Sequence, residues 1–143
     1  MLRFSLLSLL AAWVLGAANV TFAQCVESPA DTVSCASDDT DGFREKDRDD
    51  IAITVNSGVL VTNGDEAVRT DDDLTLVNNG TIRSTGNDGV QADNDAVITN
   101  NGTIESTAAD GDDGIQVGDD ATIDNTGTVI GTKDGVNAEN RVT

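Results

Sequence analysis

The sequence predicts an all-β protein, a short single-stranded parallel β-helix (β-solenoid) of about four coils. Two landmarks that repeat in step predict this fold, and no segment after Ala18 has the apolar spacing of a helix. The first landmark is a turn whose glycines are 22, 22 and 25 residues apart, at Gly58, Gly80, Gly102 and Gly127. The second is a short segment centred on an apolar residue, at Val68, Val90, Ile115 and Val136. Units of this length bury their apolar residues only by stacking.

Within each unit the apolar residues come in short alternating bursts, such as Leu74-Thr75-Leu76 and Ala96-Val97-Ile98. Asn-Gly, Asp-Gly or Asp-Asp steps separate these bursts, which is the pattern of strand, turn and strand. Stacking like positions would place the apolar residues in inward rows. We expect one row to contain Leu60, Ile82, Ile104 and Val129, and another to contain Val68, Val90, Ile115 and Val136.

Polar residues recur with the same period. Asparagine takes the same position before each repeat glycine, at Asn56, Asn78, Asn100 and Asn125. This register predicts a structural ladder of side-chain amides that hydrogen-bond from one coil to the next at a turn. Threonines also line up, at Thr81, Thr103 and Thr128. We expect them to be β-formers that face solvent, and the alternative is an ordered hydroxyl row that meets a flat lattice such as ice or a glycan crystal.

Residues 1–23 have the pattern of a secretory signal peptide. A short basic start at Met1-Leu2-Arg3 precedes an apolar run from Phe4 to Ala18, and the small-residue stretch Thr21-Phe22-Ala23 offers a cleavage site. The apolar run is too short to predict a stable membrane span. We therefore expect export through the inner membrane, to the periplasm, the cell surface or the medium.

Cys25 and Cys35 are the only two cysteines, and they follow the proposed cleavage site. In an exported protein this pair predicts a disulfide, with two free thiols as the alternative. The disulfide would staple a cap over the first coil, whose strand edges would otherwise be unpaired. We thus expect residues 24–50 to form this cap and an acidic lead-in segment, and residues 51–143 to form the solenoid, with its first strand at Ile51.

The chain is strongly acidic, with 26 Asp and Glu against 8 Lys and Arg, and its net charge is −18 at pH 7. Nucleic-acid binding needs clustered Lys and Arg to neutralise phosphates, so we exclude that function. High net charge with few aromatic residues is also typical of disorder. The periodic apolar residues favour a folded array instead.

Three features of the sequence occur together in one known pattern. They are the signal segment, the Cys25 and Cys35 pair followed by Asp39-Thr40-Asp41-Gly42-Phe43, and the repeated Asn-Asn-Gly-Thr-Ile units. The chain resembles the passenger region of bacterial autotransporters, which are right-handed parallel β-helix proteins. That resemblance implies a surface segment for adhesion, display or spacing. It implies as partners further β-helix coils, a C-terminal outer-membrane β-barrel that this chain is expected to lack, or host and environmental glycans. The motifs specify an architecture and not an activity.

The composition argues against catalysis. The chain has no His and no Tyr, so a serine or cysteine catalytic apparatus would lack its imidazole. We expect no catalytic residues and no obligatory cofactor. The alternative is a Ca²⁺-dependent β-helix protein that binds or cleaves polysaccharide, for which Arg69 and Arg83 are the candidate basic residues and paired carboxylates are plentiful.

Calcium binding without catalysis is a separate hypothesis. Asp73, Asp95 and Asp120 each stand seven residues before a repeat glycine, so they would stack as a column of like charges. A hard divalent cation held by carboxylate and carbonyl oxygens would relieve the repulsion in this column. The alternative is a row of solvated acids screened by salt.

Overall fold

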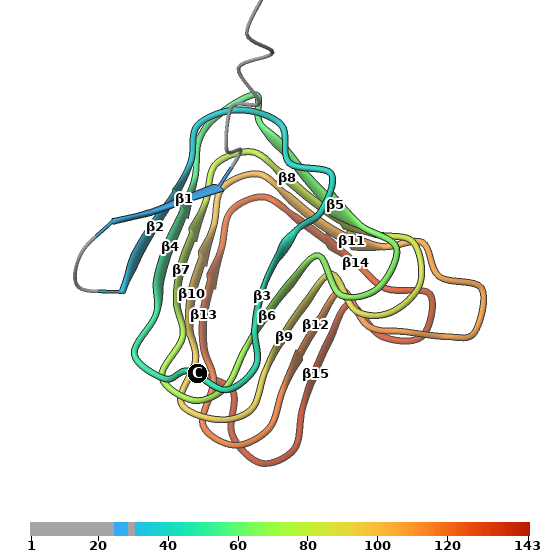
Figure 1. Cartoon of the computed structure of the whole chain (residues 1–143). Coiled ribbons are helices and arrows are strands. Elements are labelled where there is room, and N and C mark those ends of the chain that lie inside the picture. The colour runs from blue at the N-terminus through green and yellow to red at the C-terminus, as the bar shows by residue number, and fades with distance from the viewer. Residues whose placement is uncertain (1–24, 29–30) are drawn as a thin grey trace, which may run out of the picture.

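The computed structural model describes residues 25–28 and 31–143, and every regular element in this part of the chain is a β-strand. The strands wind into coils that nest one behind the next (Figure 1). This confirms the predicted fold class, an all-β parallel solenoid. Across the described residues, no helix is long and apolar enough to cross a bilayer. The predicted signal peptide, residues 1–23, lies outside the described residues.

Three sheets form the sides of the solenoid. Sheet A contains β1 (Cys25–Ser28), β2 (Thr32–Cys35), β4 (Ala52–Val55), β7 (Thr75–Asn78), β10 (Val97–Asn100) and β13 (Thr122–Asn125). Sheet B contains β5 (Leu60–Asn63), β8 (Thr81–Ser84), β11 (Thr103–Ser106) and β14 (Thr128–Ile130). Sheet C contains β3 (Phe43–Glu45), β6 (Val68–Thr70), β9 (Val90–Ala92), β12 (Ile115–Val117) and β15 (Val136–Ala138). Every strand pair is parallel except β1 with β2.

Sheet C has five strands, one from each coil, so the solenoid has about five coils and not four. The additional coil is formed by residues 31–50, within the segment 24–50 that the sequence predicts to be a cap and a lead-in segment. There β2 pairs in parallel with β4, and β3 pairs in parallel with β6. This coil was missed because it lacks the Asn-Gly turn, and its side at sheet B is reduced to a single bridge between Asp39 and Val61.

Alternate residues of each strand point inward, because successive side chains of a strand face opposite sides. The predicted row of Val68, Val90, Ile115 and Val136 is confirmed, with Phe43 stacked at its start. The other predicted row is wrong at its first member. Val61 lies opposite Ile82 and is fully buried, whereas Leu60 lies opposite Thr81 and is only half-buried.

The turn from sheet A to sheet B explains why glycine recurs. A Cβ atom placed on Gly102 would collide with the carbonyl oxygen of Gly80 in the preceding coil, and one on Gly127 would collide with that of Gly102. Coils stack at the ordinary distance between paired strands, about 4.8 Å. Glycine is therefore a packing requirement of this turn at Gly80, Gly102 and Gly127, whereas at Gly58 it is favoured by a left-handed backbone with a φ angle of 78°.

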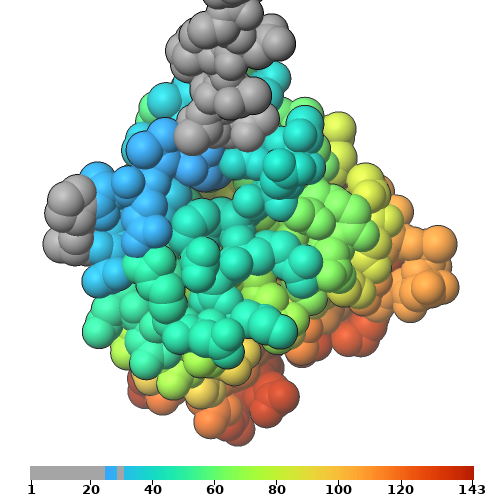
Figure 2. Space-filling model, viewed as in Figure 1, coloured from blue at the N-terminus to red at the C-terminus, as the bar shows by residue number. Residues whose placement is uncertain are grey.

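The N-terminal end of the solenoid is covered. The predicted disulfide joins Cys25 to Cys35, which lie directly opposite each other on the antiparallel strands β1 and β2. The Arg48 guanidinium bonds to the carboxylates of Glu27 and Asp31, and its hydrogen bond lowers the pKa of Glu27. Residues of the first coil and of β1 lie over the end of the molecule that faces the viewer in Figure 2.

Candidate functional site

The predicted amide ladder forms at the ends of β7, β10 and β13. The Nδ2 atom of Asn78 donates to Oδ1 of Asn100, and Nδ2 of Asn100 donates to Oδ1 of Asn125, each at 2.8 Å. Oδ1 of Asn78 accepts a further bond from the backbone N–H of Gly80 at 3.1 Å, and Oδ1 of Asn100 accepts one from Gly102 at 3.3 Å. Asn78 and Asn100 are completely buried. Their polar atoms are satisfied inside the protein, so the ladder fixes the register and offers no group to a ligand.

Asn56 does not belong to this ladder, contrary to the prediction. Val55 lies opposite Asn78, and Asn56 is exposed. The turn between β4 and β5 contains four residues, whereas the turn between β7 and β8 contains two. Aligning the repeats on their glycines therefore shifts each flanking strand by one residue. The same shift explains why Leu60 was placed in the row that Val61 occupies.

The column of Asp73, Asp95 and Asp120 exists, and its members adopt an unusual backbone conformation. Their φ angles are 57°, 54° and 55°, and Asp31 and Asp50 have φ angles of 54° and 58°. Aspartate enters this left-handed region more readily than most residues, because its short polar side chain can bond locally. The corner before each strand of sheet A therefore gives a conformational reason for aspartate in every coil.

We name the turns from sheet C to sheet A, residues 49–50, 71–73, 93–95 and 119–120, the acidic ridge. Desolvation, followed by the charges of Asp50 and Asp95, raises the pKa of Asp73. A hydrogen bond between the carboxyls of Asp71 and Asp93 is the main cause that raises the pKa of Asp71. Within residues 25–28 and 31–143, no three Asp, Glu or Cys side chains are placed to hold one metal ion. Calcium at Asp73, Asp95 and Asp120 stays a prediction.

A second column of acids was missed as a structural feature, although each member stands two residues before the apolar centre of a repeat. Glu66, Asp88 and Asp113 are 5%, 6% and 2% exposed. Arg44 and Arg69 bond to Glu66 at 2.6 and 2.9 Å. Burial raises the pKa of Asp88, although the hydrogen bond from the backbone N–H of Asp113, at 2.7 Å, acts in the opposite direction. This column supports the turn from sheet B to sheet C.

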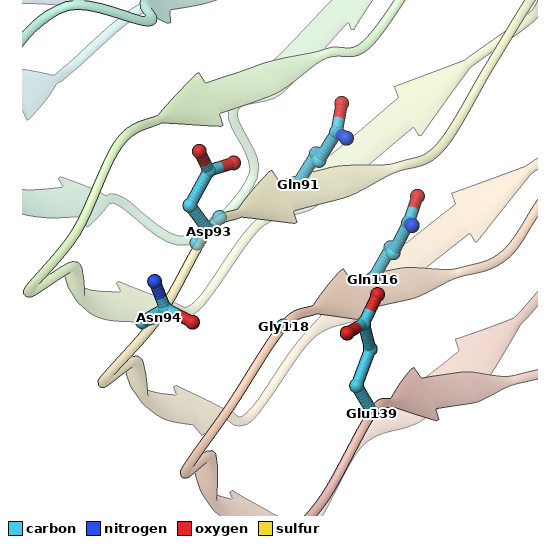
Figure 3. Close-up of a pocket in the computed structure, with 7 residues that line it drawn as sticks. Gln91, Asp93, Asn94, Gln116, Gly118 and Glu139 are labelled. Carbon is cyan, nitrogen blue, oxygen red and sulfur yellow. The ribbon is translucent and has the colours of Figure 1, made fainter.

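The outward face of sheet C is a polar groove. Its central row consists of Arg44, Arg69, Gln91, Gln116 and Asn137. A hollow of about 330 Å³ lies beside this row and is lined by Gln91, Asp93, Asn94, Gln116, Gly118 and Glu139 (Figure 3). The amides of Gln91 and Gln116 point in the same direction, and Glu139 extends toward Gln116 (Figure 3). Oε1 of Gln91 and Nε of Arg69 are buried without a hydrogen-bond partner in the described part of the chain. The groove is therefore lined by amides and carboxylates, and two polar atoms beneath its surface are unsatisfied.

The two arginines proposed for polysaccharide cleavage do not share a site. Arg69 lies on sheet C and bonds to Glu66, whereas Arg83 lies on sheet B and bonds to Glu105. Each guanidinium is therefore engaged with a different carboxylate.

Fold and surfaces together define a parallel β-solenoid with one covered end, an acidic ridge and a polar groove. Comparisons of the chain with protein-family models, with curated proteins and with solved structures give no match. The class therefore rests on the strand pairing and on the stacked rows.

The amide ladder predicts a large difference between two neighbouring asparagines. Asn100 is fully buried, and its side chain makes hydrogen bonds to Asn78, to Asn125, to the N–H of Gly102 and to the carbonyl of Thr128. Replacing it by alanine removes these bonds from the protein interior, so we expect the free energy of unfolding to fall by about 3 kcal/mol. Asn101→Ala is the matched control, because Asn101 is exposed, and its cost should stay below about 0.5 kcal/mol. Urea titration measures both values, and equal costs would contradict a structural ladder.

The acids predict an unusual pH dependence of stability. The pKa of Asp71, Asp73 and Asp88 is raised in the folded chain, so the folded state binds these protons more tightly than the unfolded state. Their contribution therefore favours folding as the pH falls through the folded pKa values toward the unfolded value of about 3.9. Glu27 acts oppositely, because its pKa is lowered and its contribution is lost in acid.

We expect the three raised groups to outweigh Glu27, so the melting temperature measured by circular dichroism should rise as the pH is lowered from 7 toward the unfolded pKa of about 4. Asp73→Asn should raise the melting temperature at pH 7 and flatten this dependence, because asparagine tolerates the same left-handed backbone. Asp110→Asn removes an equal charge from an exposed loop and serves as the control. A melting temperature that decreases steadily as the pH is lowered would contradict the proposed repulsion between the acids.

Proposed function

We propose that this chain is an exported structural solenoid segment of the autotransporter passenger type, which serves adhesion, display or spacing at a cell surface without catalysis. The observation that supports this proposal is the difference between the two ends of the solenoid. The N-terminal end is covered by β1 and its disulfide. The C-terminal end leaves apolar side chains and strand edges uncovered.

The uncovered end has the character of an interface. Val136 and Val142 are 38% and 51% exposed, and Val129, the last inward residue of sheet B, is only partly buried. Val136 closes the inward row whose earlier members, Val90 and Ile115, are fully buried. In the described residues β14 and β15 pair only with the preceding coil. Unpaired edges of this kind favour association with a further strand.

We assign this end to a further coil of the same repeat. The inward rows end in register, so another coil would bury Val136 and Val129 and would pair the free backbone groups of β14 and β15. The bridge between Ala121 and Val142 already begins such a coil. Stability of a stacked array grows with each interface between neighbours. An extended, rigid column is suited to displaying a binding surface at a distance from the cell.

Adding one coil tests the stacking directly. A copy of residues 98–120 placed after Thr143 continues the register set by Ala121 and Val142, and it should raise the melting temperature by several degrees because it adds one interface. The control is an extension of the same composition in shuffled order. No gain, or an equal gain from both extensions, would overturn the assignment of this end.

Location is the second part of the same test. Antibody labelling of intact producing cells should detect the folded solenoid outside the inner membrane, and mass spectrometry of that material should show that residues 1–23 are removed. Full-length chain confined to the cytoplasm would refute export and, with it, a surface function.

A second candidate function is binding of polysaccharide, and the polar groove on sheet C favours it. The amides of Gln91 and Gln116 lie beside the carboxylates of Asp93 and Glu139, and Oε1 of Gln91 has no hydrogen-bond partner in the described part of the chain. Retention of the protein on immobilised polysaccharide, lost in the Gln91→Ala, Gln116→Ala double variant, would support binding. Ca²⁺-dependent loss of polymer viscosity would support cleavage. Retention that the double variant preserves would exclude this groove.

A further inference from the structure

The outward face of sheet A differs from the rest of the molecule because it is almost free of charge. Its five parallel strands β2, β4, β7, β10 and β13 present two outward columns in register. One column is Thr32, Ala52, Thr75, Val97 and Thr122, and the other is Ser34, Thr54, Val77, Thr99 and Asp124. Asp124, on the last strand, is the single charged residue among them. In a chain that is 24% charged with a net charge of −18, such a face requires an explanation.

The uncharged residues follow a regular pattern. Every coil contributes one threonine to this face, and the threonine alternates between the two columns from coil to coil, at Thr32, Thr54, Thr75, Thr99 and Thr122. The neighbouring position holds a small or aliphatic residue in the first four coils. The result is a checkerboard of hydroxyl and methyl groups, spaced about 4.8 Å between coils and roughly 6.7 Å along each strand.

This array is rigid and accessible. Threonine and valine have restricted χ1 rotamers, so their hydroxyl and methyl groups are held in place before any ligand arrives. Beneath them Ile53, Leu76 and Ile98 are completely buried in the core. Val97 is 47% exposed, and sheet A is seen nearly edge-on as a straight side of the solenoid (Figure 1). The surface is therefore flat, preorganised and open to solvent.

The other two faces do not share this chemistry. Sheet B presents the ion pair between Arg83 and Glu105. Sheet C presents Arg44 and Arg69 and the amides that follow them. Ionic groups hold water strongly in orientations of their own. The face of sheet A instead leaves its neighbouring water free to order over methyl groups and to bond with evenly spaced hydroxyls.

Several occupants fit this face poorly. Polyanions are repelled by the net charge of −18, and the face offers them no cation. A second copy would have the same charge, and the outline of the five strands covers roughly 300 Å², well below the 800 Å² or so that a stable partner buries. Sugar rings would find no aromatic platform, because Phe43 is the only aromatic residue in the described part of the chain and it is buried.

We propose that the outward face of sheet A binds ice. A flat, rigid and uncharged lattice of hydroxyl and methyl groups orders a water layer that merges with the crystal, and an extended solid can be held by a surface too small for a stable protein dimer. This activity goes beyond the structural function proposed above and does not depend on it.

The test uses the oxidised, signal-free protein at millimolar concentration. A nanolitre osmometer should detect a gap between the melting and freezing temperatures together with faceted crystals, and ice recrystallisation should be inhibited. The Thr75→Lys, Thr99→Lys double variant places charges on sheet A of the third and fourth coils and should abolish both effects. The matched control is Thr81→Lys, Thr103→Lys, which places the same charges on sheet B of the same coils and should retain them.

Circular dichroism melting of both variants separates loss of binding from loss of folding, and a single Thr75→Lys variant serves if the double variant unfolds. Absence of thermal hysteresis and crystal shaping in the folded wild-type protein would overturn the proposal. Equal loss in the folded sheet A and sheet B variants would also overturn it, because the effect would then not belong to this face.

Discussion

Every feature of this molecule depends on one constraint: the backbone of each coil pairs in parallel with the next, so each residue stacks on its counterpart one repeat away. Parallel pairing fixes the distance between counterparts at about 4.8 Å. Valine on valine, asparagine on asparagine and glycine on glycine all satisfy this distance, and each does so for a different reason. Apolar rows exclude water, the amides of Asn78 and Asn100 exchange hydrogen bonds, and Gly102 allows two backbones to approach.

The same constraint makes stacked acidic residues destabilising, because it places like charges directly over one another. The chain handles its two acidic columns differently. Glu66 and Asp113 are buried but satisfied by Arg44, Arg69, Lys133 and backbone N–H groups. Asp73 and Asp95 remain at a corner, where the left-handed backbone favours aspartate and where their mutual repulsion contributes to the raised pKa of Asp73. The acidic ridge is thus a compromise between backbone conformation and electrostatics.

Three sheets give the solenoid three chemically distinct sides. The outward face of sheet C is polar and hollowed, that of sheet B carries the ion pair between Arg83 and Glu105, and that of sheet A is flat and nearly uncharged. The two ends differ as well, because among the described residues β1 covers the N-terminal end, whereas β14 and β15 at the C-terminal end pair with the preceding coil alone. In such a column the ends determine how many coils stack, whereas the outward faces of the three sheets are exposed to solvent.

The sequence by itself determined the repeat, the all-β class, the inward row from Val68 to Val136, the ladder at Asn78, Asn100 and Asn125, and the disulfide. These follow from periodic local chemistry, which stacking turns into contacts between like residues. Only the tertiary structure placed Asn56 outside the ladder and Val61 in place of Leu60, because a turn that is two residues longer changes the register without changing the period. It also revealed the first coil and the burial of Glu66, Asp88 and Asp113. Burial and register belong to the neighbouring coil as much as to the residue, so local sequence does not contain them.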